Sequence, residues 1–253
     1  MIKFLILSFI TLCSLTGSAQ FIDPRTKIPI YFEVNDDTFP ESWHSDEIAA
    51  KGVDLDTSEI ERSKRNVLAA LKKYPIEFLQ KNLKGIYVLK SIEFFGQKFG
   101  GTNSSDIVYI ANNGVSMGYT NFYLEKSFHH EFSSILLRNY PSLLDKSKWA
   151  EKNGISYGAG GVQALKNNTD SQSLQDKWAS KGFLHEYACS SQENDFNAFA
   201  ENIFNPDKDF YNQVEKFEVL KHKFDMIIDF YAHLDPWFSR NFFEMIREDY
   251  QER

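Results

Sequence analysis

The chain has 253 residues, with 28 Lys and Arg against 35 Asp and Glu, and a formal net charge of −7. This acidic balance argues against nucleic acid or an anionic membrane surface as the partner, because both are themselves polyanionic. The length fits one large domain with a sizeable core. Aromatic residues make up 15% of the chain and 23 residues are Phe, so we expect a bulky, Phe-rich core.

The first 19 residues have the pattern of a cleaved secretory signal. Lys3 precedes an apolar run of 12 residues, Phe4–Leu15, and the small residues Gly17 and Ala19 follow with signal-peptidase spacing. The run is too short to span a bilayer. Cleavage after Ala19 removes one lysine and no acid, so we expect an exported chain of residues 20–253 with a net charge of −8.

Two other interpretations of the same segment stay open. In the first, the segment is not cleaved and remains as an N-terminal anchor. In the second, the protein is a lipoprotein modified on Cys13, although Leu12 occupies the position where lipoprotein processing needs a small residue. After cleavage Cys189 is the remaining cysteine, so no intramolecular disulfide can form. We expect a periplasmic or extracellular location, with membrane association as the alternative.

The first half of the remaining chain combines helix and strand patterns. In chain order, the sequence predicts an extended segment over 28–34, a polar loop over 35–56, a helix over 57–74, a short helix over 75–85, a strand over 86–96, a glycine-containing loop, and a strand over 106–112. Thr57 is the predicted N-cap of the longer helix and Pro75 ends it. We expect the strand over 106–112 to form an edge of the sheet.

The second half is mainly helical. Its pattern predicts a helix over 121–140, irregular structure over 141–192, a helix capped by Ser191, and helices over 211–234 and 236–251. In the helix over 121–140, apolar residues at helical spacing predict a core-facing stripe (Phe128, Phe132, Ile135 and Leu136). The order of elements is typical of an α+β protein rather than of alternating βαβ units. We therefore predict one α+β domain over residues 20–253.

The stretch SFHHEFSSILL contains most of a zinc-peptidase motif. Two histidines at positions i and i+4 of a helix bind zinc from one face, and the glutamate after the first polarises the bound water. Here His130 and Glu131 supply the first two letters, but Ser134 stands at i+4 of His130, and His129 is likewise followed by Ser133. Serine is a poor zinc ligand, so the motif alone also fits an ordinary helix.

A second helix offers carboxylates to the same site. Glu193, Asn197 and Glu201 recur every four residues and form one polar stripe beside an apolar face. Such a stripe is either a solvated helix face or the source of a third metal ligand.

The blocks YPIEFLQKNLKGIYVLKSIEFFG, FHHEFSSIL, GFLHEYACSSQENDFNAFAENIF and LKHKFDMIIDFY resemble a known family. This family comprises secreted and lipoprotein-type zinc-binding metallopeptidases found with TonB-linked nutrient importers in Bacteroidota-like bacteria. The likeness covers most of residues 74–231. It implies a zincin-like fold with a small antiparallel or mixed sheet, an active-site helix and a mainly helical C-terminal half.

The resemblance also implies roles for single residues. His130 matches the first metal histidine and Glu131 the general base, while Ser134 stands where the second histidine belongs. In one register Asn197 stands where the third ligand belongs and Glu201 matches the last glutamate of the motif; a shift of one turn makes Glu193 the ligand instead. The sequence leaves both registers open.

Other nearby side chains offer compensation for the missing ligands. His185 lies in the segment that leads into the second helix and could turn toward the site, whereas His129 could do so only in a distorted helix, because adjacent residues point about 100° apart. Tyr187 is a candidate for stabilising an oxyanion.

Two functions follow. One is a metallopeptidase-like protein with lost or weakened catalysis that binds a peptide or other small ligand beside an outer-membrane uptake system. The other is an active zinc hydrolase with a non-standard ligand set, in which Glu131 is the base and the metal is held by His130 with some of His185, Glu193 and Glu201.

Overall fold

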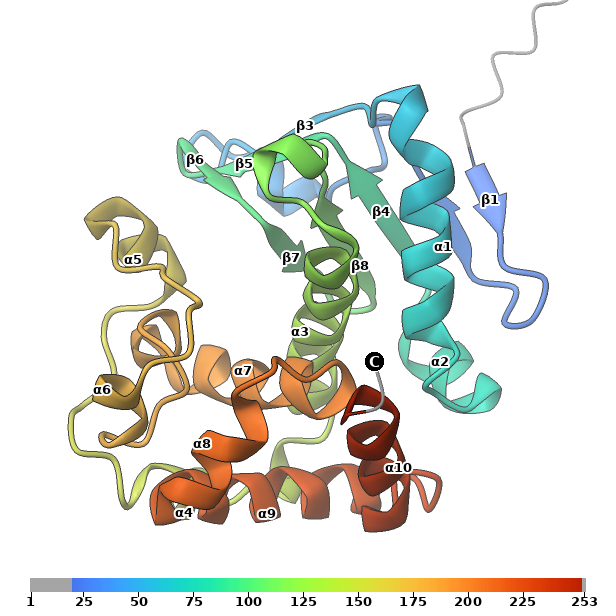
Figure 1. Cartoon of the computed structure of the whole chain (residues 1–253). Coiled ribbons are helices and arrows are strands. Elements are labelled where there is room, and N and C mark those ends of the chain that lie inside the picture. The colour runs from blue at the N-terminus through green and yellow to red at the C-terminus, as the bar shows by residue number, and fades with distance from the viewer. Residues whose placement is uncertain (1–19, 252–253) are drawn as a thin grey trace, which may run out of the picture.

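The computed structural model describes residues 20–251, so the predicted signal segment, residues 1–19, lies outside the described part. Within these residues the chain is an α+β protein with two small sheets and a mainly helical C-terminal half (Figure 1). No helix in the described range is both long and apolar enough to cross a membrane.

The larger sheet has five strands and is mixed. In spatial order they are β1 (Gln20–Ile22), β2 (Pro29–Tyr31), β4 (Gly85–Leu89), β8 (Ile107–Ala111) and β7 (Gly101–Asn103). β2, β4 and β8 are parallel, whereas the outer strands β1 and β7 are antiparallel to their neighbours. Every residue of β4 is buried, as expected of a parallel strand covered on both faces. The prediction that the strand over 106–112 forms the edge is wrong, because the glycine-containing segment before it folds back as β7.

The smaller sheet contains β3 (Lys51–Val53), β5 (Ser91–Phe94) and β6 (Gln97–Phe99). The single strand predicted over 86–96 is therefore two strands in different sheets. They separate at Lys90, whose N–H donates to the carbonyl of Val53 at 2.9 Å. Phe95 and Gly96 join β5 to β6 with positive φ angles of 54° and 68°, as a two-residue hairpin turn of the primed type requires.

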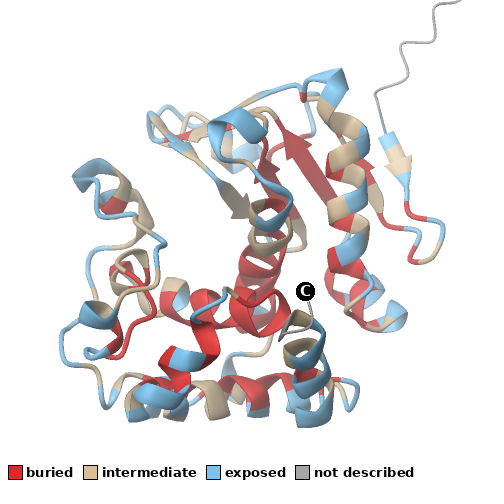
Figure 2. Ribbon diagram, in the orientation of Figure 1, coloured by how far each residue is buried: buried red, intermediate tan, exposed pale blue. Residues whose placement is uncertain are grey.

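Helices cover the larger sheet and form the other half of the molecule. They are α1 (Ile60–Leu71), α2 (Ile76–Asn82), α3 (Asn121–Asn139), α4 (Lys146–Ala150), α5 (Gly161–Asn167), α6 (Asp176–Ala179), α7 (Gln192–Phe204), α8 (Phe210–Lys216), α9 (Glu218–Leu234) and α10 (Arg240–Gln251). Five 3-10 turns lie between the strands and helices of residues 20–251: η1 (Glu41–His44), η2 (Thr57–Glu59), η3 (Val115–Met117), η4 (Pro141–Leu143) and η5 (Tyr187–Ser190). Figure 2 shows α3 as a largely buried column between the sheet and the C-terminal helices.

Several predicted boundaries differ from the structure. Thr57 does not cap α1, because the 3-10 turn η2 precedes the helix. The helix predicted over 211–234 breaks at Phe217 into α8 and α9, and the segment predicted as irregular, 141–192, contains three short helices. Ser191 does cap α7, with its hydroxyl oxygen accepting from the N–H of Asn194 at 3.1 Å.

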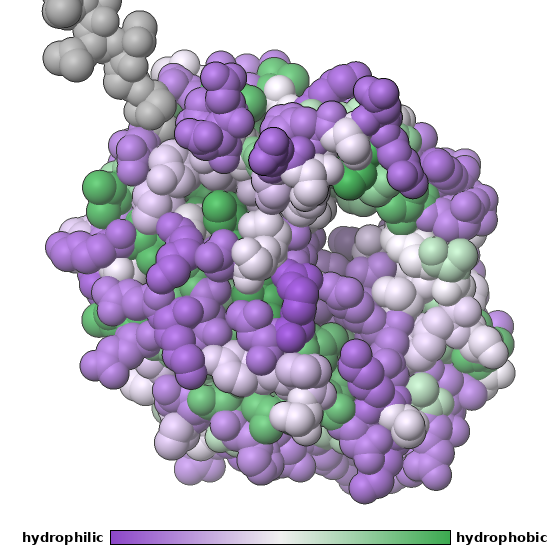
Figure 3. All heavy atoms as spheres, turned by 180° about the vertical axis from the view of Figure 1, so that it is seen from behind, coloured by the Kyte–Doolittle hydropathy of each residue, from purple (hydrophilic) through white to green (hydrophobic). Residues whose placement is uncertain are grey.

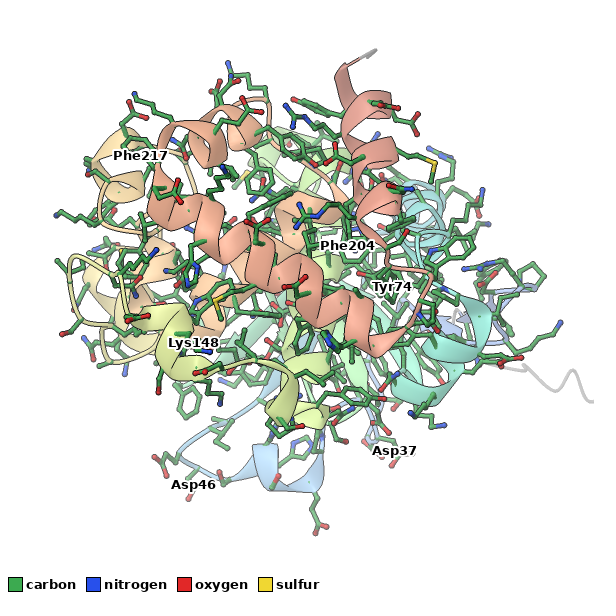
Figure 4. All side chains as sticks on the ribbon, turned by 90° about the horizontal axis from the view of Figure 1, so that it is seen from below. Asp37, Asp46, Tyr74, Lys148, Phe204 and Phe217 are labelled. Atoms are coloured by element: carbon green, nitrogen blue, oxygen red, sulfur yellow. The ribbon has the colours of Figure 1, made fainter. Side chains whose placement is uncertain are left out.

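The expected Phe-rich core is present and connects the two halves. Tyr74, just after α1, stacks on Phe204 at the end of α7 with ring centroids 4.6 Å apart, and both lie under the C-terminal helices (Figure 4). Phe132 of α3 and Phe238 before α10 meet the Tyr74 ring at 5.2 and 5.6 Å. One hydrophobic cluster thus holds α1, α3, α7 and α10 together.

Candidate functional site

The helix that carries the His-Glu pair is buried on all sides at its centre. Thr120 caps α3 by accepting a hydrogen bond from the N–H of Tyr123 at 3.1 Å. Every residue from Phe128 to Leu137 is buried, not only the predicted apolar stripe. Polar side chains at these positions therefore need partners inside the protein, because a buried polar group without a hydrogen bond is costly.

His130 is paired with Glu201 of α7. Its Nδ1 lies 2.8 Å from Glu201 Oε2, and the other carboxylate oxygen of Glu201 lies 3.2 Å from Lys126 Nζ. Lys126 also donates to the side-chain oxygen of Asn202 at 3.0 Å. A cation, a carboxylate and an imidazole thus form one connected group between α3 and α7.

This pairing shifts the pKa values of Glu201 and His130 in opposite directions. Burial raises the pKa of Glu201, but Lys126 and His130 outweigh burial and bring that pKa down to about 2. Burial lowers the pKa of His130, but the hydrogen bond with Glu201 and the charge of Glu131 outweigh it, so the pKa of His130 is raised. His130 accordingly donates its Nδ1 proton to an ionised Glu201, and the ring also lines the cleft described below.

Glu131, also on α3, directs its carboxyl group to β7 at the edge of the larger sheet. Its exposed fraction is 9%, and Asn103 of β7 donates its side-chain amide to Oε2 at 2.8 Å. Oε1 lies so close to Gly101 that a Cβ atom there would come within 2.7 Å of it, which only glycine avoids. Burial raises the pKa of Glu131, and the charge of His130 opposes this rise.

Ser134 and Asn197 face each other across α3 and α7. Asn197 donates its side-chain amide to Ser134 Oγ at 2.7 Å and accepts from Ser133 Oγ at 2.6 Å. The residues at the two positions where the family resemblance expects a histidine and a carboxylate are therefore bonded to one another. Asn197 is fully enclosed, whereas Glu193, one turn earlier, is exposed.

The compensating residues do not complete a ligand set. His129 points away from Glu131, toward Tyr74, whose hydroxyl lies 2.7 Å from its Nδ1. His185 is buried near Glu201, but its Nδ1 accepts from the N–H of Ala188 at 3.1 Å and its Nε2 has no partner in the described structure. The ring of Tyr187 lies alongside His130 with centroids 6.3 Å apart.

A cleft of about 410 Å³ opens above these residues. Its walls come from β6 and β7, from α3, and from the segment of α5 and η5, and Figure 3 shows the molecule hollowed on this side. The volume lies within the range of roughly 300–1,000 Å³ that is usual for ligand sites. His130, Glu131, Glu201 and Tyr187 all line it, whereas His185 and Glu193 do not.

The free edge of β7 borders this cleft. Ser104 N–H donates to Ile107 O and Ala111 N–H donates to Gly100 O, so the even-numbered residues bond to β8. In an antiparallel pair the alternate residues direct their N–H and C=O groups away from the partner strand. Gly101 and Asn103 therefore present backbone donors and acceptors at the free edge.

The donor set does not fit a catalytic zinc ion. Such a site needs three protein ligands and an open position. Within residues 20–251, no group of three or more His, Cys, Asp or Glu is arranged to hold a metal. Glu201 is already paired with His130 and Lys126, and Ser134 and Asn197 are hydrogen-bonded to each other, so His130 Nε2 has no second or third ligand beside it among these residues.

Comparison of the chain with protein-family models, with curated proteins and with solved structures finds no match.

The sequence did not point to three polar contributors to this site. Lys126 precedes His130 by one turn, so its helical spacing was available as evidence. Asn103 follows the paired glycines, where the sequence predicts a loop, and Asp207 follows the end of α7. The contact of Asn103 with Glu131 and the place of Asp207 in the cleft lining depend on tertiary packing that no local pattern reports.

Proposed function

We propose that the chain is a zincin-like protein derived from a zinc metallopeptidase, with catalysis lost or weakened, that binds an extended peptide in its cleft. The hydrogen bonds of Asn197 with Ser133 and Ser134 carry this proposal. Ser134 and Asn197 stand at the positions where the resembled family has a histidine and a carboxylate, and here neutral side chains bond to each other at these positions.

Peptide binding is supported by the edge of the sheet rather than by the motif. Extended peptides add to an exposed strand edge through main-chain hydrogen bonds, and pockets beside the edge select the side chains. β7 offers such an edge through Gly101 and Asn103, directly beside the cleft. Proteins usually protect a strand edge that has no partner with charged side chains, a bulge or a covering segment, so an open edge beside a cleft favours a binding role.

The resemblance to exported metallopeptidases adds location to the proposal. We infer that the protein is exported and acts in the cell envelope, beside an outer-membrane uptake system, as a binding component.

Zinc analysis of purified residues 20–253 tests the loss of the metal site. After incubation with micromolar zinc and desalting, we expect sub-stoichiometric metal in the wild type and the same amount in H130A. In S134H/N197E, which restores both missing donor types, we expect near-stoichiometric zinc that a chelator removes. Stoichiometric zinc in the wild type that H130A abolishes would instead favour the active hydrolase.

The backbone amide signals of the protein test whether a peptide binds along β7. In ¹⁵N-labelled protein titrated with extended octapeptides, we expect the largest amide shifts at Gly101 and Asn103. Peptides that shift only residues outside β7 would contradict edge binding.

A further inference from the structure

The charged residues that line the cleft are unbalanced. Four carboxyl groups line it (Glu131, Asp170, Glu201 and Asp207), against one lysine and one histidine, Lys126 and His130. Both of these side chains contact Glu201 directly. Acidic groups thus outnumber basic ones in the lining, and none of Glu131, Asp170 and Asp207 has a lysine or arginine as an ion-pair partner among the described residues, so this part of the cleft favours a cationic ligand group.

Glu131 holds the most enclosed of these three charges. Asn103 satisfies one of its oxygens, while Oε1 accepts no hydrogen bond from any residue of the described part. The side chain is about nine-tenths buried and lines the cleft beside Gly101, at the free strand edge. A carboxylate in this position is matched best by a donor that comes from the ligand.

Asp170 and Asp207 surround the opening. Asp170 is exposed and Asp207 is half-buried, and neither has an ion-pair partner among the described residues. Their position at the mouth attracts a cation at longer range, and salt screens this attraction.

Aromatic side chains complete the lining. Phe99, Phe122, Tyr123 and Tyr187 border the cleft. Aromatic faces attract an ammonium or guanidinium group and also cover the apolar stem of a Lys or Arg side chain. One cavity thus combines a buried anion, anions at the mouth and apolar walls.

We propose that the cleft selects its peptide through one basic side chain, whose ammonium or guanidinium group contacts Glu131 while the peptide backbone runs along β7. This inference rests on the proposed peptide binding and adds the chemical class of the ligand. The residue that matches the general base of the metallopeptidases serves here as a counter-ion for the ligand.

Calorimetry with paired octapeptides in the presence of EDTA tests the inference. The peptides are identical except for a central Lys or its neutral isostere norleucine. We expect the wild type to bind the Lys peptide about tenfold more tightly, and E131Q, which keeps the acceptor for Asn103, to bind both peptides equally. E151Q, on the exposed surface outside the cleft, is the matched control and keeps the preference.

A second variant keeps the test decisive if E131Q does not fold. In D170N/D207N, whose side chains are not enclosed, we expect the preference for Lys to fall about threefold and to depend less on salt. Equal binding of Lys and norleucine peptides to the wild type overturns the basic-side-chain inference and leaves peptide binding intact. Binding of neither peptide overturns both proposals.

Discussion

At the scale of single residues, two histidines are kept neutral inside the protein. Burial lowers the pKa of His129 and of His185 to about 4 in each case. Both rings use Nδ1 in a hydrogen bond, and both leave Nε2 buried without a hydrogen-bond partner in the described structure. Glu125, 3.8 Å from His129 Nε2, and Glu201, near His185, favour the protonated rings, but burial outweighs both carboxylates.

The H185N variant tests the linkage between this burial and pH. An unfolded histidine has a pKa of about 6.5, so below that pH the unfolded chain takes up a proton that folded His185 does not accept until about pH 4. His185 therefore destabilises the fold as pH falls through this window, by about 3 kcal/mol in total. Asparagine keeps an acceptor for the N–H of Ala188 but does not titrate.

Urea denaturation at several pH values measures this effect. We expect H185N to be less stable than the wild type at neutral pH, because the smaller side chain leaves a cavity. The difference in free energy of unfolding between the two proteins should shrink by about 3 kcal/mol toward pH 4. A gap that stays constant with pH would show that His185 is not held neutral.

At the scale of elements, Asn197 links α7 to α3 through side-chain hydrogen bonds. Its two hydrogen bonds reach consecutive serines on the facing helix, and all three residues are buried. Side-chain hydrogen bonds thus hold the buried faces of the two helices together.

Removal of the Asn197 amide should therefore loosen the contact between the two helices. We expect N197A to lower the free energy of unfolding by about 2–3 kcal/mol, because Ser134 loses its donor and a small cavity remains. N194A, on the same helix and half-buried, is the matched control and should cost less than about 1 kcal/mol. Urea denaturation compares the two; equal losses would argue against a special role for Asn197.

The elements also show what the sequence could predict. Local chemistry was enough for α3 and α7, because Pro141 and the Ser191 cap mark their ends and both have helical apolar spacing. The edge strand β7 and the split at Lys90 were missed, since pairing partners far along the chain decide both. The approach of His130 and Glu201 could be anticipated from the His-Glu motif and the polar stripe of the second helix, but the Asn103–Glu131 contact could not.

At the scale of the whole molecule, one buried ion pair joins the irregular middle of the chain to its end. Lys223 of α9 lies 2.6 Å from Asp195 of α7, and both side chains are fully buried. Trp149 and Tyr157 donate to the same carboxylate oxygen at 2.8 and 2.6 Å, and Lys223 also donates to the carbonyl of Gly182. These contacts hold the chain between α4 and α7, and this part of the chain forms one wall of the cleft and carries Asp170 and Tyr187 into its lining.

The K223M variant should disturb this whole wall. It leaves Asp195 buried without its cation, and loss of one partner of a buried pair costs about 3–5 kcal/mol. D195N/K223M removes both charges, and we expect it to recover a large part of the free energy of unfolding lost in K223M. A double-mutant cycle measured by urea denaturation gives the size of this recovery. Because Tyr187 and Asp170 line the cleft from this segment, K223M should also weaken peptide binding more than the double variant does. Additive losses in the cycle would mean that the two charges do not stabilise each other, and the cleft wall would then depend on aromatic packing around Trp149 alone.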